Sequence, residues 1–271
     1  MSVSFAAAAC APLVAQPAES ALFLDLDGTL APIVAHPRDA RMIDGAAELV
    51  VRLRDRLGLV GFVSGRGLED LRRIVDIPGC AYAGNHGFEL QLPGGPIRTA
   101  EAALPWREPI DRFAAKWDAR LRADAGLHIE HKGATLSVHW RMAPDREAAR
   151  ATLEHHVGPA AQADGLAVTW GRMVMEIRPP VAIDKGTAVT ALLDAGTWTN
   201  AAYFGDDLTD ADAWRALRDL RDRGVLQSAV AILAAGPETP VELHAATDAA
   251  VDGPPGILRL LESLTGTIDA Q

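Results

Sequence analysis

FLDLDGTLAPIV, residues 23–34, holds the pattern from which the fold of this chain can be worked out. An apolar run stops at two carboxylates, and the chain then turns at Gly28. Side chains along a strand alternate between faces, so Asp25 and Asp27 emerge on the same side of the strand end while Leu26 points away. Two neighbouring anions repel each other unless a cation or a reaction uses them. The stretch therefore predicts a strand that ends at a functional site.

Strands and helices alternate on both sides of this stretch. From residue 21 to residue 77 the pattern is strand, helix, strand, helix, with Leu49, Val50, Leu53 and Leu57 on one helix face. The alternation returns over residues 184–264, with strands expected at 201–207 and 228–233. Repeated βα units joined by right-handed crossovers imply a parallel sheet. We therefore expect a Rossmann-like α/β core, built from residues 1–105 and 184–271.

The middle of the chain follows another pattern. Two helices, at 110–123 and 145–157, are interleaved with four strands, at 127–133, 134–141, 166–170 and 172–179. This order predicts an inserted α+β domain over residues 106–183.

The strands of the insert alternate polar and apolar residues, which predicts one apolar and one polar sheet face. The polar positions are Glu130 and Lys132, then Ser137, His139 and Arg141, then Glu176 and Arg178. Solvent exposure alone could explain such a face, so the pattern does not by itself indicate a binding surface.

The charge balance argues for a small ligand. The 271 residues include 36 acidic and 26 basic ones, a formal charge of −10, and no basic cluster that a nucleic acid would need. No apolar run reaches the length of a membrane span, and Cys10 and Cys80 have neither disulfide-framework nor metal-ligand spacing. The Ala-rich start lacks Lys or Arg before Arg38, so we expect a loose tail rather than a secretory leader. We predict a cytoplasmic monomer with no nucleic-acid or membrane partner.

Four motifs fall at the predicted carboxyl ends of core strands, where ligands of open α/β sheets bind. They are DLDGT at 25–29, SGR at 64–66, GDD at 205–207, and Lys185 at a nearby helix start. Each motif also has a structural explanation: DLDGT could be surface charge or a calcium-type loop, Ser64, Asp207 or Asp210 could cap a helix, and Lys185 could be solvated. Together these residue types suit phosphoryl transfer, because a metal must neutralise carboxylates and phosphate at once.

These four motifs resemble those of the haloacid dehalogenase superfamily. The stretches SGR, GNHGFEL, HIEHKG, MEIRP and GDDLTD are also similar to the trehalose-6-phosphate phosphatase family within it. The resemblance implies that Asp25 is the nucleophile and Asp27 the general acid and base. It implies a Mg²⁺ ion held by Asp25, the backbone carbonyl of Asp27 and Asp206, supported by Asp207. Ser64 and Lys185 are implied to hold the transferring phosphoryl group.

The resemblance also assigns the insert as a cap for substrate recognition. Glu130, Lys132 and Glu176 are implied to contact sugar hydroxyls, and Arg66, Asn85 and His86 lie on loops near the same crevice. For His86 a purely structural role in its loop is an equally good reading. One departure is Ala211, where the family often has glutamate after GDD-x-T-D, and it implies an altered metal affinity.

The expected function is hydrolysis of trehalose 6-phosphate through an aspartyl-phosphate intermediate, the last step of trehalose biosynthesis. The alternatives are a phosphatase of sucrose phosphate, mannosyl-phosphoglycerate or a related sugar ester, and a phosphomannomutase. A sensor without catalytic activity is a rival from another class, although it could dispense with Asp25 or Asp27.

Overall fold

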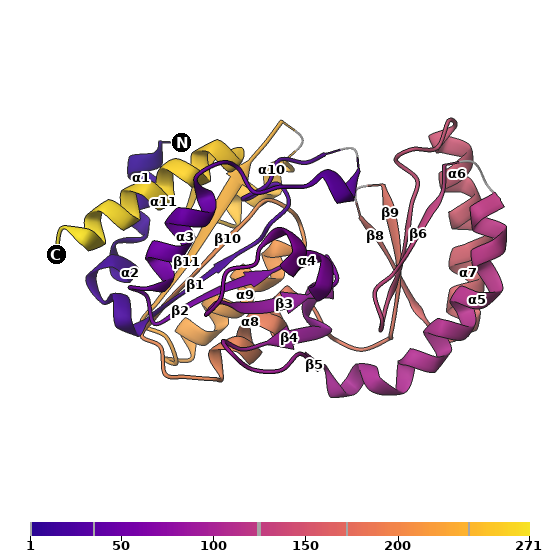
Figure 1. Cartoon of the computed structure of the whole chain (residues 1–271), viewed down its shortest axis with the longest axis horizontal. Coiled ribbons are helices and arrows are strands. Elements are labelled where there is room, and N and C mark those ends of the chain that lie inside the picture. Colours follow the sequence, from indigo (N-terminus) through magenta and orange to yellow (C-terminus); the bar gives the residue numbers. More distant parts are fainter. Residues whose placement is uncertain (1, 35, 124–125, 172, 238) are drawn as a thin grey trace. The chain divides into compact units, whose positions relative to one another are not determined.

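The computed structural model describes residues 2–34, 36–123, 126–171, 173–237 and 239–271. The chain forms two compact units, Met1–Arg98 with Ile183–Gln271, and Thr99–Ala182 (Figure 1). The second unit begins at Thr99 rather than at residue 106, because the short helix η4 (Glu101–Trp106) leads directly into helix α5 (Arg107–Ala123).

The first unit is built on one eight-stranded sheet. Its strands, in spatial order, are β12 (Ala249–Asp252), β11 (Ser228–Ala235), β10 (Asn200–Gly205), β1 (Ser20–Leu24), β2 (Leu59–Val63), β3 (Ala81–Gly84), β4 (Glu89–Gln91) and β5 (Arg98–Thr99). The strands from β12 to β3 pair in parallel, and β4 runs antiparallel to β3. The predicted parallel-sheet core is confirmed, and β1 lies at its centre between β10 and β2.

Helices cover both faces of this sheet (Figure 1). Leu22 and Leu24 of β1 pack into one core, and Phe23 packs into the opposite core. The first core includes α1 (Val3–Ala9), α2 (Ala11–Ala15), α3 (Ala46–Arg54), α4 (Leu68–Ile74) and α11 (Gly253–Asp269). The second includes α8 (Lys185–Leu193), α9 (Asp210–Asp222) and α10 (Val241–Ala245). Because apolar side chains cover both faces, the polar groups of the strands are left to gather at the strand ends.

The expectation of a loose N-terminal tail is wrong. The segment forms α1 and α2, and Ala6, Cys10 and Leu13 are fully buried against the sheet unit. Alanine has the highest helix propensity, and its small side chain lets α1 pack closely on α11 and β12. The sequence pattern did not reveal this packing because an alanine-rich stretch shows no contrast between its faces.

The second unit has a four-stranded antiparallel sheet in the order β6 (His128–His131), β7 (Leu136–His139), β9 (Val174–Arg178) and β8 (Ala167–Gly171). Its helices are α5, α6 (Arg146–Thr152), the π-helical turn η5 (Leu153–Val157) and α7 (Gly158–Ala163). Residue 172, at the start of the last predicted strand, lies outside the described residues.

The alternation predicted for these strands is present. Ile129, Leu136, Val138, Met175 and Ile177 are buried in one core with the helices of this unit. The polar side chains therefore occupy the opposite sheet face.

Across the described parts of the chain, no helix combines the length and the apolar character that crossing a membrane requires.

Candidate active site

β1 carries the first acidic motif to the end of the sheet. All five strand residues are buried, and the backbone N–H of Asp25 donates to the carbonyl of Phe204 at 2.9 Å, which extends the pairing with β10. Asp25 is 4% exposed. A parallel strand that is buried on both faces thus ends in a carboxylate that is shielded from solvent.

The turn after β1 requires glycine at position 28. Gly28 has a φ of +86°, and a Cβ atom there would lie 2.0 Å from Oδ2 of Asp206. Its N–H donates to the carbonyl of Ala31 at 2.7 Å, which closes the turn. Only glycine, which has no side chain, at position 28 therefore allows the ends of β1 and β10 to lie this close together.

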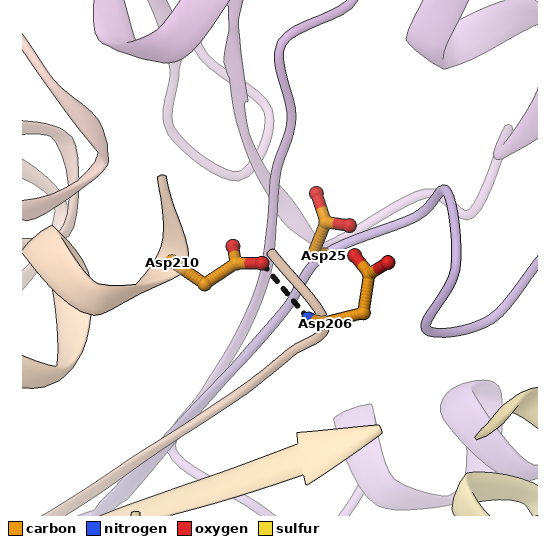
Figure 2. A group of neighbouring side chains, drawn as sticks. All are labelled: Asp25, Asp206 and Asp210. Carbon is orange, nitrogen blue, oxygen red and sulfur yellow. Dashed lines mark hydrogen bonds between the residues drawn. The ribbon is translucent and has the colours of Figure 1, made fainter. Parts of the chain in front are cut away.

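Three carboxylates meet at this point. Asp206 directly follows β10, Asp210 is the first residue of α9, and both lie beside Asp25 (Figure 2). One carboxylate oxygen from each of the three lies within 4.8 Å of the other two. Oxygen donors of this kind are those that hard divalent cations prefer, so the cluster could hold a metal ion.

Asp210 organises the cluster through four hydrogen bonds. Its Oδ1 accepts from Nζ of Lys185 and from the hydroxyl of Tyr203, both at 2.6 Å. Its Oδ2 accepts from the backbone N–H groups of Asp206 and Asp207, both at 2.9 Å. Asp210 is fully buried, and its bonds to the N–H groups of Asp206 and Asp207 fix the conformation of the loop after β10.

Lys185 links the cluster to α8. It is 3% exposed, and its Nζ donates to Oδ1 of Asp25 at 2.8 Å as well as to Asp210. The helix that presents it begins with a capping box between Asp184 and Thr187, which fixes the position of the first turn.

The site holds more acidic than basic side chains. Burial raises the pKa of Asp25 to about 8, with Asp210 and Asp27 adding to the rise and Lys185 opposing it. Burial likewise raises the pKa of Asp206 to about 9, helped by the charges of Asp25 and Asp210. Burial alone would lower the pKa of Lys185, but the two carboxylates beside it outweigh burial and raise it. One ammonium group thus faces three carboxylates, a deficit that a divalent cation would correct.

Asp27 lies outside the cluster, in a bidentate ion pair with Arg66. Nε and one terminal nitrogen of Arg66 donate to its two carboxylate oxygens at 2.5 and 2.7 Å. The same guanidinium donates to Asp70 at 2.6 Å and to the carbonyl of Pro37 at 3.0 Å. The side chain of Asp27 is therefore oriented by the loop that follows β2.

Ser64 and the loop after β3 complete this end of the sheet. Ser64 follows β2 and is 1% exposed, and its carbonyl accepts the N–H of His86 at 2.9 Å. The N–H of Asn85 donates to the carbonyl of Arg66 at 2.5 Å. Asn85 and His86 adopt φ values of +53° and +56°, a conformation that residues other than glycine rarely adopt. These contacts bring Ser64, Arg66, Asn85 and His86 together.

Asp207 does not join the three-carboxylate cluster. Its Oδ1 accepts the N–H of Leu208 at 2.6 Å. Of the side chains predicted to surround the metal, the structure brings together those of Asp25 and Asp206, and it adds Asp210 to them.

The predicted sugar contacts lie together in the second unit. Glu130, Ser137 and Glu176 are aligned across β6, β7 and β9. Nζ of Lys132 lies 3.4 Å from Glu176 and 3.9 Å from Glu130.

Sequence reasoning treated Asp210 as a possible helix cap and as one of the aspartates near the metal, without predicting its contact with Lys185, and it missed Tyr203. A usable signal was present, because Asp210 falls on the buried face of α9 with Ala213, Trp214, Leu217 and Leu220. A carboxylate in register with the apolar face of an amphipathic helix must find a partner in the protein interior.

The fold and the acidic cluster define an α/β protein with a haloacid dehalogenase-like core. A solved structure with the same fold is the C-terminal domain of trehalose-6-phosphate phosphatase from Candida albicans, with a TM-score of 0.77 at 21% identity over 98% of this chain and 97% of that one. The chain itself belongs to the trehalose-phosphatase family, whose model matches residues 23–241.

Curated relatives agree with this family. A trehalose-phosphate phosphatase of Mycobacterium marinum is 39% identical over 73% of this chain and 51% of its own length. An uncharacterized glycosyl hydrolase of Mycobacterium tuberculosis is 40% identical over 73% of this chain but only 15% of its own length. The chain therefore spans about half, or much less, of the curated relatives that it matches.

Proposed function

We propose that this chain hydrolyses trehalose 6-phosphate to trehalose and inorganic phosphate, the last step of trehalose biosynthesis. Family membership and relatives that carry this name support the substrate. The observation that carries the chemistry is the buried Asp25, held by Lys185 beside two further carboxylates.

Asp25 is proposed as the nucleophile. One of its carboxylate oxygens attacks phosphorus and forms an aspartyl phosphate, while the bond from phosphorus to the sugar oxygen breaks. The hydrogen bond from Lys185 fixes the orientation of this carboxylate before attack. Lys185 and Ser64 are proposed to hold the oxygens of the transferring group, where charge develops.

Asp27 is proposed as the acid and then the base. In the first step it gives its proton to the departing sugar oxygen, and in the second it takes a proton from the water that attacks the aspartyl phosphate. Release of phosphate then restores the carboxylate of Asp25. Both carboxylate oxygens of Asp27 are occupied by the ion pair with Arg66 in this structure, so in the proposed acid step Arg66 releases one of them and that oxygen carries the proton.

Mg²⁺ is proposed as the cofactor, held by the side chains of Asp25 and Asp206 and by the backbone carbonyl of Asp27, with Asp207 in support. The carboxylates of Asp25 and Asp206 fit this ion, since they offer hard oxygen atoms and belong to a cluster of three neighbouring carboxyl groups. When bound, the ion neutralises the carboxylates and the phosphate ester together.

The second unit is proposed as the cap that recognises the sugar. Glu130, Lys132 and Glu176 are proposed to bind sugar hydroxyls, because each carboxylate can accept several O–H hydrogen bonds in fixed directions. Arg66, Asn85 and His86 are proposed as further substrate contacts from the first unit.

The protein is proposed to act in the cytoplasm as a monomer. Cys10 and Cys80 are both buried and free, which fits a reducing compartment.

The first experiment measures phosphate release from trehalose 6-phosphate, sucrose 6-phosphate, glucose 6-phosphate, mannosyl-phosphoglycerate and para-nitrophenyl phosphate, with Mg²⁺ and with excess EDTA. We expect metal-dependent preference for the trehalose ester. The variant Asp25→Asn should lose at least about a thousandfold in kcat while keeping its circular-dichroism spectrum. Preference for another ester would overturn the assignment of substrate, and inactivity on all of them would favour a sensor.

A second measurement tests the cap assignment. Glu176→Ala is expected to lower kcat/KM on trehalose 6-phosphate far more than on para-nitrophenyl phosphate, which has no sugar. Equal losses on the two substrates would contradict a sugar contact at Glu176.

A further inference from the structure

The polar face of the second sheet carries two ordered rows of side chains. Glu130, Ser137 and Glu176 form one row across β6, β7 and β9. In the neighbouring row His128 pairs with His139 across β6 and β7, and their ring centroids are 6.1 Å apart. His139 thus lies beside the first row, on the inner strand β7.

The two carboxylates of the first row share one ammonium group. Lys132 lies 3.4 Å from Oε1 of Glu176 and 3.9 Å from Oε2 of Glu130, and the lysine side chain is 7% exposed. Ser137, fully buried, donates to Oε1 of Glu176 at 3.4 Å. Glu176 therefore has two neighbours, Lys132 and Ser137, each at 3.4 Å. Lys132 lies farther from Glu130, at 3.9 Å.

His139 makes a short contact with Glu130. Its Nε2 lies 3.0 Å from Oε2 of Glu130. Because a carboxylate only accepts hydrogen bonds, the ring nitrogen is the donor. A glutamate side chain has three rotatable bonds, and its rotation is restricted most effectively by a bond at its outer end.

We propose that His139 is a positioning residue that fixes the carboxylate of Glu130 in the orientation needed to accept hydrogen bonds from sugar hydroxyls. The inference rests on the proposed function, in which Glu130 contacts the sugar. Recognition of hydroxyl groups depends on the direction of each acceptor, so a Glu130 that lacks the bond to His139 would bind the sugar more weakly without affecting the phosphoryl transfer itself.

The test compares His139→Phe with His139→Gln. Phenylalanine preserves the ring volume but has no donor, whereas the side-chain amide of glutamine can place an N–H at about the position of Nε2. His131→Phe is the matched control, because His131 lies on the same strand pair but on the opposite face, 3.9 Å from Asp118. Steady-state rates are measured on trehalose 6-phosphate and on para-nitrophenyl phosphate with saturating Mg²⁺.

His139→Phe is expected to lower kcat/KM on the trehalose ester about tenfold, equivalent to ~1.4 kcal/mol, mainly through a higher KM. Its rate on the aryl phosphate should be unchanged, which also shows that it folds. His139→Gln should recover most of the loss, and in a Glu130→Ala background His139→Phe should have little further effect.

Equal losses for the phenylalanine and glutamine variants, a matching loss on the aryl phosphate, or an effect no larger than that of His131→Phe would overturn the inference. The proposed function is tested separately by the wild type. A wild type inactive on trehalose 6-phosphate overturns that function and this inference with it, whereas an active wild type with an unaffected His139→Phe overturns this inference alone.

Discussion

Replacing Asp210 with asparagine is expected to lower the free energy of unfolding by about 3–5 kcal/mol. Asp210 is fully buried and accepts hydrogen bonds from Lys185, Tyr203 and the backbone of Asp206 and Asp207. Asparagine has a single acceptor oxygen, so at least one of the two pairs of donors loses its acceptor. Each buried donor without an acceptor costs about 1–3 kcal/mol.

Two effects set the total within this range. Lys185 loses one of its two carboxylate partners while it stays buried, and breaking a buried ion pair in this way is costly. The loss of a negative charge beside Asp25 and Asp206 acts in the opposite direction, because it removes repulsion among the carboxylates. Two unsatisfied donors would together cost about 2–6 kcal/mol, and we expect the net loss of unfolding free energy to lie near the middle of that range.

Urea unfolding at pH 7 in EDTA measures this free energy, followed by tryptophan fluorescence and circular dichroism. The matched control is Asp212→Asn on the same helix, where Asp212 pairs with the exposed Arg215 at 3.0 Å. The control should change stability by less than about 0.5 kcal/mol. A loss below about 1 kcal/mol for Asp210→Asn, with an unchanged m-value, would refute the reasoning from its four hydrogen bonds.

Three further outcomes follow from the same contacts. In EDTA the Tm should fall as the pH rises from 3.8, the ordinary pKa of aspartate, toward about 9, because folded Asp25 and Asp206 retain protons that the unfolded chain has released. Scanning fluorimetry measures the slope of Tm against pH, and identical slopes for the wild type and Asp206→Asn would contradict this. Gly28→Ala should lower the rate of phosphate release about a hundredfold, because its Cβ would displace Asp206. The control Gly94→Ala, with φ +68° but open space around it, should retain the wild-type rate. Leu13→Ala should cost about 2–5 kcal/mol in urea unfolding, and a change near zero would mean that α2 does not contribute to the core.

The central strands were predictable because each is a short apolar run that ends in polar residues. The predicted strand from 201 and the observed β10 (Asn200–Gly205) differ by one residue at the start, and Asp206 falls directly after the strand. In a parallel sheet the position of a strand end fixes the position of the residue that follows it. The contact of Asp25 with Lys185 at 2.8 Å agrees with a prediction made from strand ends and from the start of a nearby helix.

Contacts that depend on side-chain direction were not predictable. Nothing in the spacing of Asp27 and Arg66 indicates that the arginine forms a bidentate pair with this carboxylate and also bonds Asp70. The short strands β3 and β12 were missed as well, since a strand of four residues has too little alternation to recognise. Tertiary pairing, rather than local pattern, decides such elements.

The insertion of the second unit between β5 and α8 has a consequence for the order in which the protein can fold during synthesis. Ser20 of β1 and Asn200 of β10 pair although 180 residues separate them, and 160 residues separate Asp25 from Lys185. The central strand of the first unit therefore leaves the ribosome long before one of its two neighbours exists. All strands of the second unit, by contrast, lie within Thr99–Ala182, so its sheet can form while the first unit still waits for β10. The carboxylate of Asp25 meets Lys185 only after the inserted unit has had the time to fold.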